Sequence, residues 1–224
     1  INMKYFVLSA TQSSLCPISL VDDAVLYMNK EQASQNIECG SLPWYSYKTS
    51  KNCDLPIEGV LILKSKKIEI SIRNINENIY VVDEIFKNIF GKYINSDFIR
   101  VEVLSESLEK INNKNYYIFR FNQIFDFKNV LDLNKSTYRL DNDFLVLEKA
   151  EFLSDLDIDI LKIDNMDSAQ DTFFISEFVK KEIEKNKYQG INIFELTLAQ
   201  WRDSDDFSFM FLSEDEVNKF VWPI

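Results

Sequence analysis

Two segments of eleven residues, 93 positions apart, align without a gap and constrain the local structure of the chain more than any other feature. They are YVVDEIFKNIF at 80–90 and FFISEFVKKEI at 173–183. In each, an apolar strand precedes Asp83 or Ser176, whose side-chain oxygen suits a helix N-cap, and an amphipathic helix follows. Gly190 is placed to end the second helix before another strand. The pattern predicts two strand–cap–helix segments, which arose by internal duplication or represent a common local solution.

Short apolar and alternating segments predict that strands dominate the rest of the chain. Ile68, Ile70 and Ile72 alternate with polar residues, which predicts one buried and one solvated face. The predicted strands are 5–8, 59–63, 68–73, 116–127 and the hairpin 138–147, which turns at Asp141, Asn142 and Asp143. A short helix is predicted from Asp22 and Asp23 through Met28 to Gln35.

These elements predict an α+β fold with a mostly antiparallel sheet and a few flanking helices. Strands 59–63 and 68–73 are expected to be joined by a charged turn, and 116–127 and 138–147 are expected to be central strands. The length fits one unit over residues 1–224, or two lobes divided near residue 76.

The chain lacks the residues that most enzymes use for nucleophilic or nucleotide chemistry. It has no histidine and only four glycines, so its serines and its cysteines, Cys16, Cys39 and Cys53, have no imidazole base. No GxSxG or glycine-rich phosphate loop occurs, and we expect no catalytic residue and no cofactor. Three cysteines without a CxxC pair indicate a reducing, cytoplasmic setting. No apolar run exceeds five residues, against roughly 20 for a membrane span.

The acidic residues are concentrated toward the end of the sequence. The net charge is +1 over residues 1–75, −2 over 76–150 and −10 over 151–224. An acid excess repels nucleic acids and anionic membranes, and it suits a basic protein partner. The charge distribution therefore favours a protein-binding function over catalysis.

Three alternating aspartates, Asp155, Asp157 and Asp159, raise the question of a calcium site. An EF-hand would need glycine and glutamate at the positions of Ile160 and Met166. We therefore predict a strand with one solvated acidic edge, and no metal site.

A second acidic group follows Trp201 and forms the predicted binding site. Its members are Asp203, Asp205, Asp206, Glu214, Asp215 and Glu216. A tryptophan beside carboxylates is typical of an interface anchor within an electrostatic rim. The structural interpretation is a core tryptophan near a helix that begins with the capping box of Ser213 and Glu216. The two interpretations are compatible.

Three segments carry a resemblance to a known family: 116–140, 144–152 and 173–196. An aromatic pair opens a strand, a V/L-D-x-x-x-S segment follows, and a later strand enters a Ser-Glu helix that closes on glycine. The matching positions are Tyr116, Tyr117, Leu131, Asp132, Ser136, Ser176, Glu177 and Gly190. These features resemble bacterial immunity proteins of polymorphic toxin systems, although Gln189 stands where the family usually has threonine and Phe194 lies one step later than its usual aromatic residue.

The resemblance implies a non-enzymatic protein that binds and neutralises a cognate toxin in the cytoplasm of the producing cell. Trp201 and the six acidic residues named with it are then the candidate toxin-binding residues. Two other functions stay open. One is an adaptor that binds an endogenous basic protein, and the other is a carboxylate-based hydrolase, which would need two acidic residues with raised pKa values in a deep cleft.

Overall fold

The structure is a computed structural model, and it describes residues 3–11, 13, 15–17, 20, 23–35, 54–76, 78–166, 172–199 and 201. Between the described strands, eight of the ten ladders are antiparallel and two are parallel. The predicted α+β fold with mostly antiparallel sheets is therefore confirmed. Among the described helices, none has the length and apolarity needed to cross a membrane.

The chain divides into two compact units. Unit 1 comprises residues 1–13 and 123–224, and unit 2 comprises residues 14–122. The alternative predicted from the sequence was two lobes divided near residue 76. That residue is the last of a strand inside unit 2. The division instead follows the first strand, which belongs with the second half of the chain.

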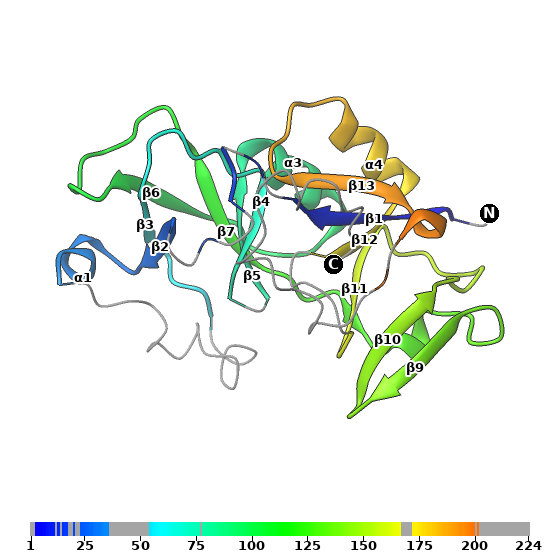
Figure 1. Ribbon diagram of the computed structural model, residues 1–224. Coiled ribbons are helices and arrows are strands. Elements are labelled where there is room, and N and C mark those ends of the chain that lie inside the picture. The colour runs from blue at the N-terminus through cyan, green and yellow to red at the C-terminus, as the bar shows by residue number, and fades with distance from the viewer. Residues whose placement is uncertain are drawn as a thin grey trace. The chain divides into compact units, whose positions relative to one another are not determined.

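Unit 2 contains a six-stranded sheet (Figure 1). In order across the sheet, its strands are β2 (Ala24–Tyr27), β3 (Gly59–Leu63), β6 (Ile99–Ser105), β7 (Tyr116–Arg120), β5 (Ile79–Asp83) and β4 (Ile72–Asn76). The helices among its described residues include α1 (Lys30–Ser34) and α3 (Glu84–Tyr93). Strand β7 lies between two neighbours, as predicted for a central strand. Adjacent residues Ile118 and Phe119 are both fully buried, so both faces of β7 are covered.

Two strand predictions in unit 2 were partly wrong. Ile68, Ile70 and Ile72 are buried as predicted, but the strand begins only at Ile72, and it pairs with β5. The expected solvated face is also absent at Arg73, which is fully buried. Its Nε donates to the carbonyl of Pro17 at 2.9 Å and its Nη1 to that of Ile72 at 3.3 Å. These bonds replace the water that a buried guanidinium loses.

The helix predicted from Asp22 and Asp23 was wrong over residues 24–27. That segment forms β2, which pairs antiparallel with β3 and buries Leu26 and Tyr27. Helix α1 begins only at Lys30, where the Oδ1 of Asn29 accepts a hydrogen bond from the backbone N–H of Gln32 at 2.9 Å. Packing against β3 therefore outweighs the helix-start signal of the aspartates.

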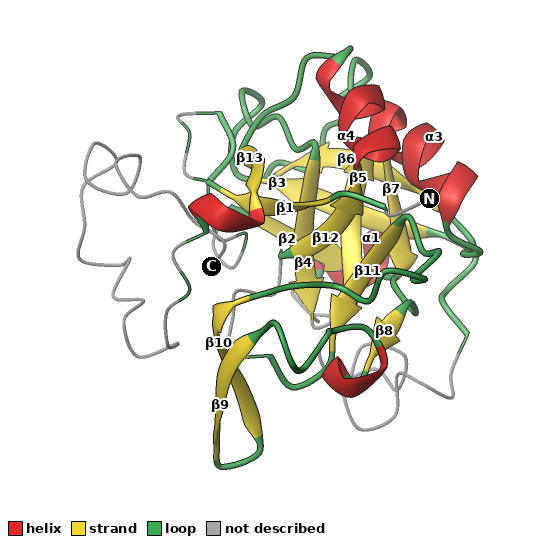
Figure 2. Ribbon diagram, turned by 90° about the vertical axis from the view of Figure 1, so that its right-hand side faces the viewer, coloured by secondary structure: helices red, strands yellow, loops and turns green. Residues whose placement is uncertain are grey.

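Unit 1 combines a five-stranded sheet with a separate two-stranded hairpin (Figure 2). The sheet order is β13 (Ile191–Glu195), β1 (Tyr5–Ala10), β12 (Phe173–Ser176), β11 (Ile160–Ile163) and β8 (Ile124–Phe125). The hairpin consists of β9 (Thr137–Asp141) and β10 (Phe144–Lys149). The described part of unit 1 also contains helix α4 (Glu177–Glu184) and the 3-10 helices η2 (Phe127–Asn129) and η3 (Leu196–Leu198).

The strands of unit 1 test several predictions. Strand 5–8 is confirmed as β1, and the hairpin at 138–147 is confirmed as β9 and β10. The hairpin is not central, because it forms a sheet of its own. The predicted strand 116–127 is split, with β7 in unit 2 and β8 in unit 1.

The two strand–cap–helix segments are confirmed. Strand β5 leads into α3, and the carboxylate of Asp83 accepts from the N–H of Phe86 at 2.7 Å. Strand β12 leads into α4, where the Oγ of Ser176 accepts from the N–H of Val179 at 3.4 Å. Gly190 has the positive φ of 71° that favours glycine, but it lies six residues beyond the end of α4 and precedes β13.

Candidate binding surface

The β9–β10 hairpin forms because its turn residues tolerate left-handed backbone. Asn142 and Asp143 have φ values of 46° and 72°, and they connect Asp141 to its partner Phe144. Asparagine and aspartate reach this region at low cost, and the resulting two-residue turn matches the twist of an antiparallel pair. The hairpin extends away from β1, β12 and β13 in both views (Figures 1 and 2).

One face of the hairpin is anchored in the core of unit 1, and its tip is exposed. Leu145 and Leu147 are buried, and the ring of Tyr138 lies 5.2 Å from that of Phe127, centroid to centroid. At the tip, Leu140 and Phe144 are 55% and 53% exposed. The register places these two side chains on opposite faces of the hairpin, because Leu140 pairs with Leu145 and Phe144 pairs with Asp141.

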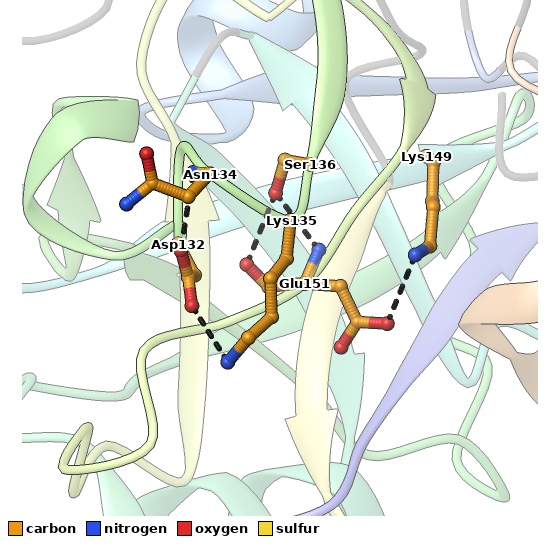
Figure 3. Close-up of polar contacts among 6 residues, drawn as sticks. All are labelled: Asp132, Asn134, Lys135, Ser136, Lys149 and Glu151. Atoms are coloured by element: carbon orange, nitrogen blue, oxygen red, sulfur yellow. Dashed lines mark hydrogen bonds and ion pairs between the residues drawn. The ribbon is translucent and has the colours of Figure 1, made fainter.

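A polar clasp holds the base of the hairpin (Figure 3). The Oγ of Ser136 donates to the carbonyl of Glu151 at 3.1 Å and accepts from the N–H of the same residue at 3.0 Å. The N–H of Asp132 also donates to that carbonyl, at 2.8 Å. These bonds tie the segment before β9 to the segment after β10, so they fix where the hairpin starts.

Asp132 stabilises the same turn from its other side. Its carboxylate accepts from the N–H of Asn134 at 3.1 Å and forms an ion pair with the Nζ of Lys135 at 2.9 Å (Figure 3). The hydrogen bond from Lys135 lowers the pKa of Asp132. Because the Lys135 side chain is exposed to water, the role of this pair is mainly to set the geometry of the turn.

A hollow of about 180 Å³ adjoins the tip of the hairpin. Leu140, Leu145 and Phe127 contribute apolar surface to it. Its polar lining comprises Asp126, Asp143, Asp164, Lys128 and Asn165. Apolar walls beside three carboxylates suit the methylene stem and cationic head of a lysine or arginine side chain.

The surplus of acidic residues belongs almost entirely to unit 1. This unit contains twelve Lys/Arg and twenty-two Asp/Glu, a net charge of −10, whereas unit 2 contains thirteen and fourteen, a net charge of −1. Within unit 1, residues 126–166 include the hairpin and carry five Lys/Arg and ten Asp/Glu. The hairpin therefore lies in a field that attracts basic groups.

The structure places one of the predicted binding residues. Trp201 is half-buried, and its ring centroid lies 6.0 Å from that of Phe174 in the core of unit 1. This contact favours the structural interpretation of Trp201 over an interface anchor. The acidic members of the predicted site, Asp203, Asp205, Asp206, Glu214, Asp215 and Glu216, lie outside the described residues, as does Ser213.

The strand predicted for Asp155, Asp157 and Asp159 was wrong. These residues precede β11 in turns and irregular backbone, because the strand begins only at Ile160. Asp155 and Asp157 are exposed, but Asp159 is half-buried and accepts a hydrogen bond from the Oγ of Ser176. Within the described part of the chain, no group of three or more acidic or cysteine side chains is arranged to hold a metal ion.

The positions that carry the family resemblance have structural roles in this chain. Tyr116 and Leu131 are buried, and Ser136 and Ser176 form the clasp and the helix cap described above. The hydroxyl of Tyr116 also accepts from the N–H of Ile70 at 3.0 Å. These matching positions stabilise the fold, and the exposed tip residues Leu140 and Phe144 are not among them. The sequence predicted the turn of this hairpin but not the exposure of its tip.

One carboxyl group has a strongly shifted pKa. Burial raises the pKa of Asp83 to about 6, against hydrogen bonds from the N–H groups of Phe86 and Ile85 that lower it. The position of Asp83 at the start of α3 explains why a carboxylate is placed there at all. A hydrolase would need a second such group beside it, and Glu84, which contributes to the shift, is exposed on the helix.

Comparisons with models of known protein families and with curated proteins gave no match for this chain.

Proposed function

We propose that this chain is an immunity protein that binds and neutralises a cognate bacterial toxin in the cytoplasm of the producing cell. The observation that carries the proposal is the position of the charge. Unit 1 holds −10 of the total −11, and it presents a projecting hairpin with two exposed apolar residues at its tip. The resemblance of segments 116–140, 144–152 and 173–196 to immunity proteins points to the same class of partner.

Charge complementarity gives this arrangement a physical function. An acidic surface accelerates encounter with a basic toxin and discourages binding to partners of the wrong charge. Many toxins that act on nucleic acids are basic, since they must approach phosphates. Apolar contacts at the hairpin tip would then slow dissociation, because most differences in affinity between related complexes lie in the off-rate.

The function is tested with the protein encoded by the neighbouring gene. Its C-terminal domain is expressed in a bacterial host from an inducible promoter, with or without this chain, and growth is recorded. We expect growth to stop without the chain and to resume with it, and the two proteins to purify as one complex. A neighbouring protein that binds the chain without being toxic would support the adaptor function instead. Absence of both binding and protection would contradict the proposal.

Binding kinetics at two salt concentrations test the electrostatic part. We expect the on-rate to fall several-fold in Asp141→Asn/Asp143→Asn, and to fall steeply when salt is raised above 0.1 M, where the Debye length is about 10 Å. Asp155→Asn/Asp157→Asn removes the same charge from exposed positions of the same unit and is the matched control. Neutralising Asp203, Asp205 and Asp206 tests the site predicted from the sequence. Equal on-rates for all variants at both salt concentrations would contradict steering by this unit.

A further inference from the structure

We propose that the toxin binds by adding a β-strand to the outer edge of β9, and that this strand carries lysine or arginine residues. The inference rests on the proposed function and specifies the surface at which it operates. Four of the five residues of β9 are exposed, and the fifth, Tyr138, is half-buried.

The register of the hairpin shows which backbone groups face outward. Asp141 and Phe144 flank the two-residue turn and form a hydrogen-bonded pair, so the next pair, Leu140 and Leu145, directs its N–H and C=O groups away from the ladder. The N–H of Leu145 accordingly donates to the carbonyl of Asn165 at 2.7 Å, on the side of β10 away from β9. By the same alternation, Tyr138 and Leu140 present their backbone groups at the outer edge of β9.

No residue in the described part of the chain pairs with this edge of β9. Edge strands are usually protected by proline, by a bulge or by charges that repel another strand. Strand β9 contains no proline, and the irregularity of the hairpin lies in β10, between Leu147 and Lys149. Its two charged side chains, Arg139 and Asp141, form an ion pair with each other at 3.3 Å. With respect to the described residues, the edge is therefore open to an additional strand.

Charge identifies the occupant. The segment 126–166 has twice as many acidic as basic residues, which favours a strand with cationic side chains. Leu140 connects the two features, since its backbone groups face the outer edge and the residue also lines the hollow, whose charged lining is three carboxylates and one lysine. A strand added at β9 can thus place a lysine or arginine head among these carboxylates. A second copy of this chain is disfavoured, because two units of charge −10 repel each other.

The test compares Leu140→Pro with Leu140→Ala, against the toxin domain encoded next to this chain. Proline removes the outward N–H, and it is tolerated at an edge because that N–H has no partner within the hairpin. Alanine removes the side chain and keeps the N–H, so it is the matched control for the lost apolar contact. We expect Leu140→Pro to weaken binding by about tenfold more than Leu140→Ala, mainly through the off-rate. Circular dichroism and the melting midpoint establish that each variant is folded.

Hydrogen exchange gives a second measurement that does not depend on a variant. The amides of Tyr138 and Leu140 should exchange rapidly in the free chain and be protected in the complex, whereas protection of Arg139 and Asp141, which bond across the hairpin, should change less.

The outcomes separate this inference from the proposed function. If the unmodified chain binds the toxin, but Leu140→Pro binds as well as Leu140→Ala and the two amides stay unprotected, strand addition is overturned and the immunity function stands. If the unmodified chain does not bind, both fall. If sedimentation of the free chain shows a dimer that Leu140→Pro dissociates, the edge serves self-association and the proposed occupant is wrong.

Discussion

The two units share one arrangement of four strands and a helix. They differ in which part of the chain supplies the strand that is inserted in the middle of that arrangement. In unit 2, the antiparallel pair β4–β5 leads into α3 and then β6, with β7 inserted between β5 and β6. In unit 1, the antiparallel pair β11–β12 leads into α4 and then β13, with β1 inserted between β12 and β13. In both, the inserted strand is antiparallel to its two neighbours. The correspondence thus extends beyond the eleven aligned residues and favours duplication over a common local solution.

The origin of the inserted strand is the main difference. Strand β7 follows β6 along the chain, but β1 precedes everything else in unit 1 and is separated from the rest of that unit by the whole of unit 2. The sheet of unit 1 therefore requires a long-range closure, which is slow to form compared with local pairing. The same sheet topology can therefore be formed with a middle strand that is near in sequence or distant in sequence, provided that the strand directions agree.

Core substitutions at corresponding helix positions should have the largest effects. Phe90 and Ile183 are equivalent in the alignment, and both are fully buried. Phe90→Ala should cost about 3–5 kcal/mol of unfolding free energy and Ile183→Ala about 2–5 kcal/mol, because each leaves a cavity. Denaturant unfolding measures these losses.

The strands in which hydrogen exchange accelerates show whether each unit unfolds cooperatively on its own. Hydrogen exchange in Phe90→Ala should accelerate in β5 and β7 more than in β12, and Ile183→Ala should give the reverse. Equal acceleration in both units after either substitution would show that they unfold together.

Trp201→Ala should have a smaller effect than either core substitution. The ring of Trp201 packs against Phe174 but is only half-buried, so the loss should be about 2 kcal/mol, below the 3–5 kcal/mol of a fully buried aromatic residue. We expect the melting midpoint to fall and the toxin off-rate to stay unchanged. A raised off-rate with an unchanged midpoint would restore Trp201 to the binding surface.

Ser176→Ala tests the cap of unit 1. The Oγ of Ser176 accepts from the N–H of Val179 and donates to the carboxylate of Asp159, so removing it leaves both groups without this partner. The expected loss is about 0.5–2 kcal/mol in unfolding free energy, measured by denaturant titration. Ser154→Ala, at an exposed position of the same unit, is a control that should change little. If toxin affinity falls while stability is unchanged, Ser176 contributes to binding instead.

Local signals in the sequence predicted most of the elements but not their partners. The caps at Asp83 and Ser176 and the Asp141–Asp143 turn were found because a few neighbouring residues determine them. Strand pairing depends on contacts distant in sequence. The sequence therefore predicted a helix over 24–27, where β2 pairs with β3, and a strand from Ile68, where β4 begins only at Ile72. The burial of Arg73 was missed for the same reason, since the carbonyl of Pro17 that satisfies it is remote in the sequence.

For the candidate surface, the sequence predicted only the sign of the charge. The acid excess is readable from composition, and it belongs to unit 1. The pairing of β1 in that unit could not be predicted, because no nearby residue in the sequence indicates that the first strand lies between β12 and β13. The exposure of Leu140 and Phe144 was likewise hidden, since alternating apolar residues in a hairpin predict burial on one face. Exposure at the tip results from the hairpin extending beyond the rest of its core.

The smallest expected effect is a gain in unfolding free energy, not a loss. It distinguishes the helix cap at Asp83 from the one at Ser176. Burial raises the pKa of Asp83 to about 6, whereas the corresponding Ser176 does not titrate. Since the pKa is higher in the folded state, the contribution of Asp83 to stability is fully present below about pH 4 and is lost as the pH rises through 6. Asparagine caps a helix as well as aspartate does and carries no charge. Asp83→Asn should therefore stabilise the protein by about 1 kcal/mol at pH 7.5 and by much less at pH 5.

Unfolding free energies at these two pH values measure the difference, with Ser176→Ala as the control whose cost should be similar at both. An equal effect of Asp83→Asn at pH 5 and pH 7.5 would mean that the carboxyl is already ionised at the lower pH. The pKa of Asp83 in the folded protein would then not be raised, and its ionisation would not make stability depend on pH between these two values. A stabilisation confined to the higher pH would instead show that unit 2 bears the cost of a buried charge that the serine cap of unit 1 avoids.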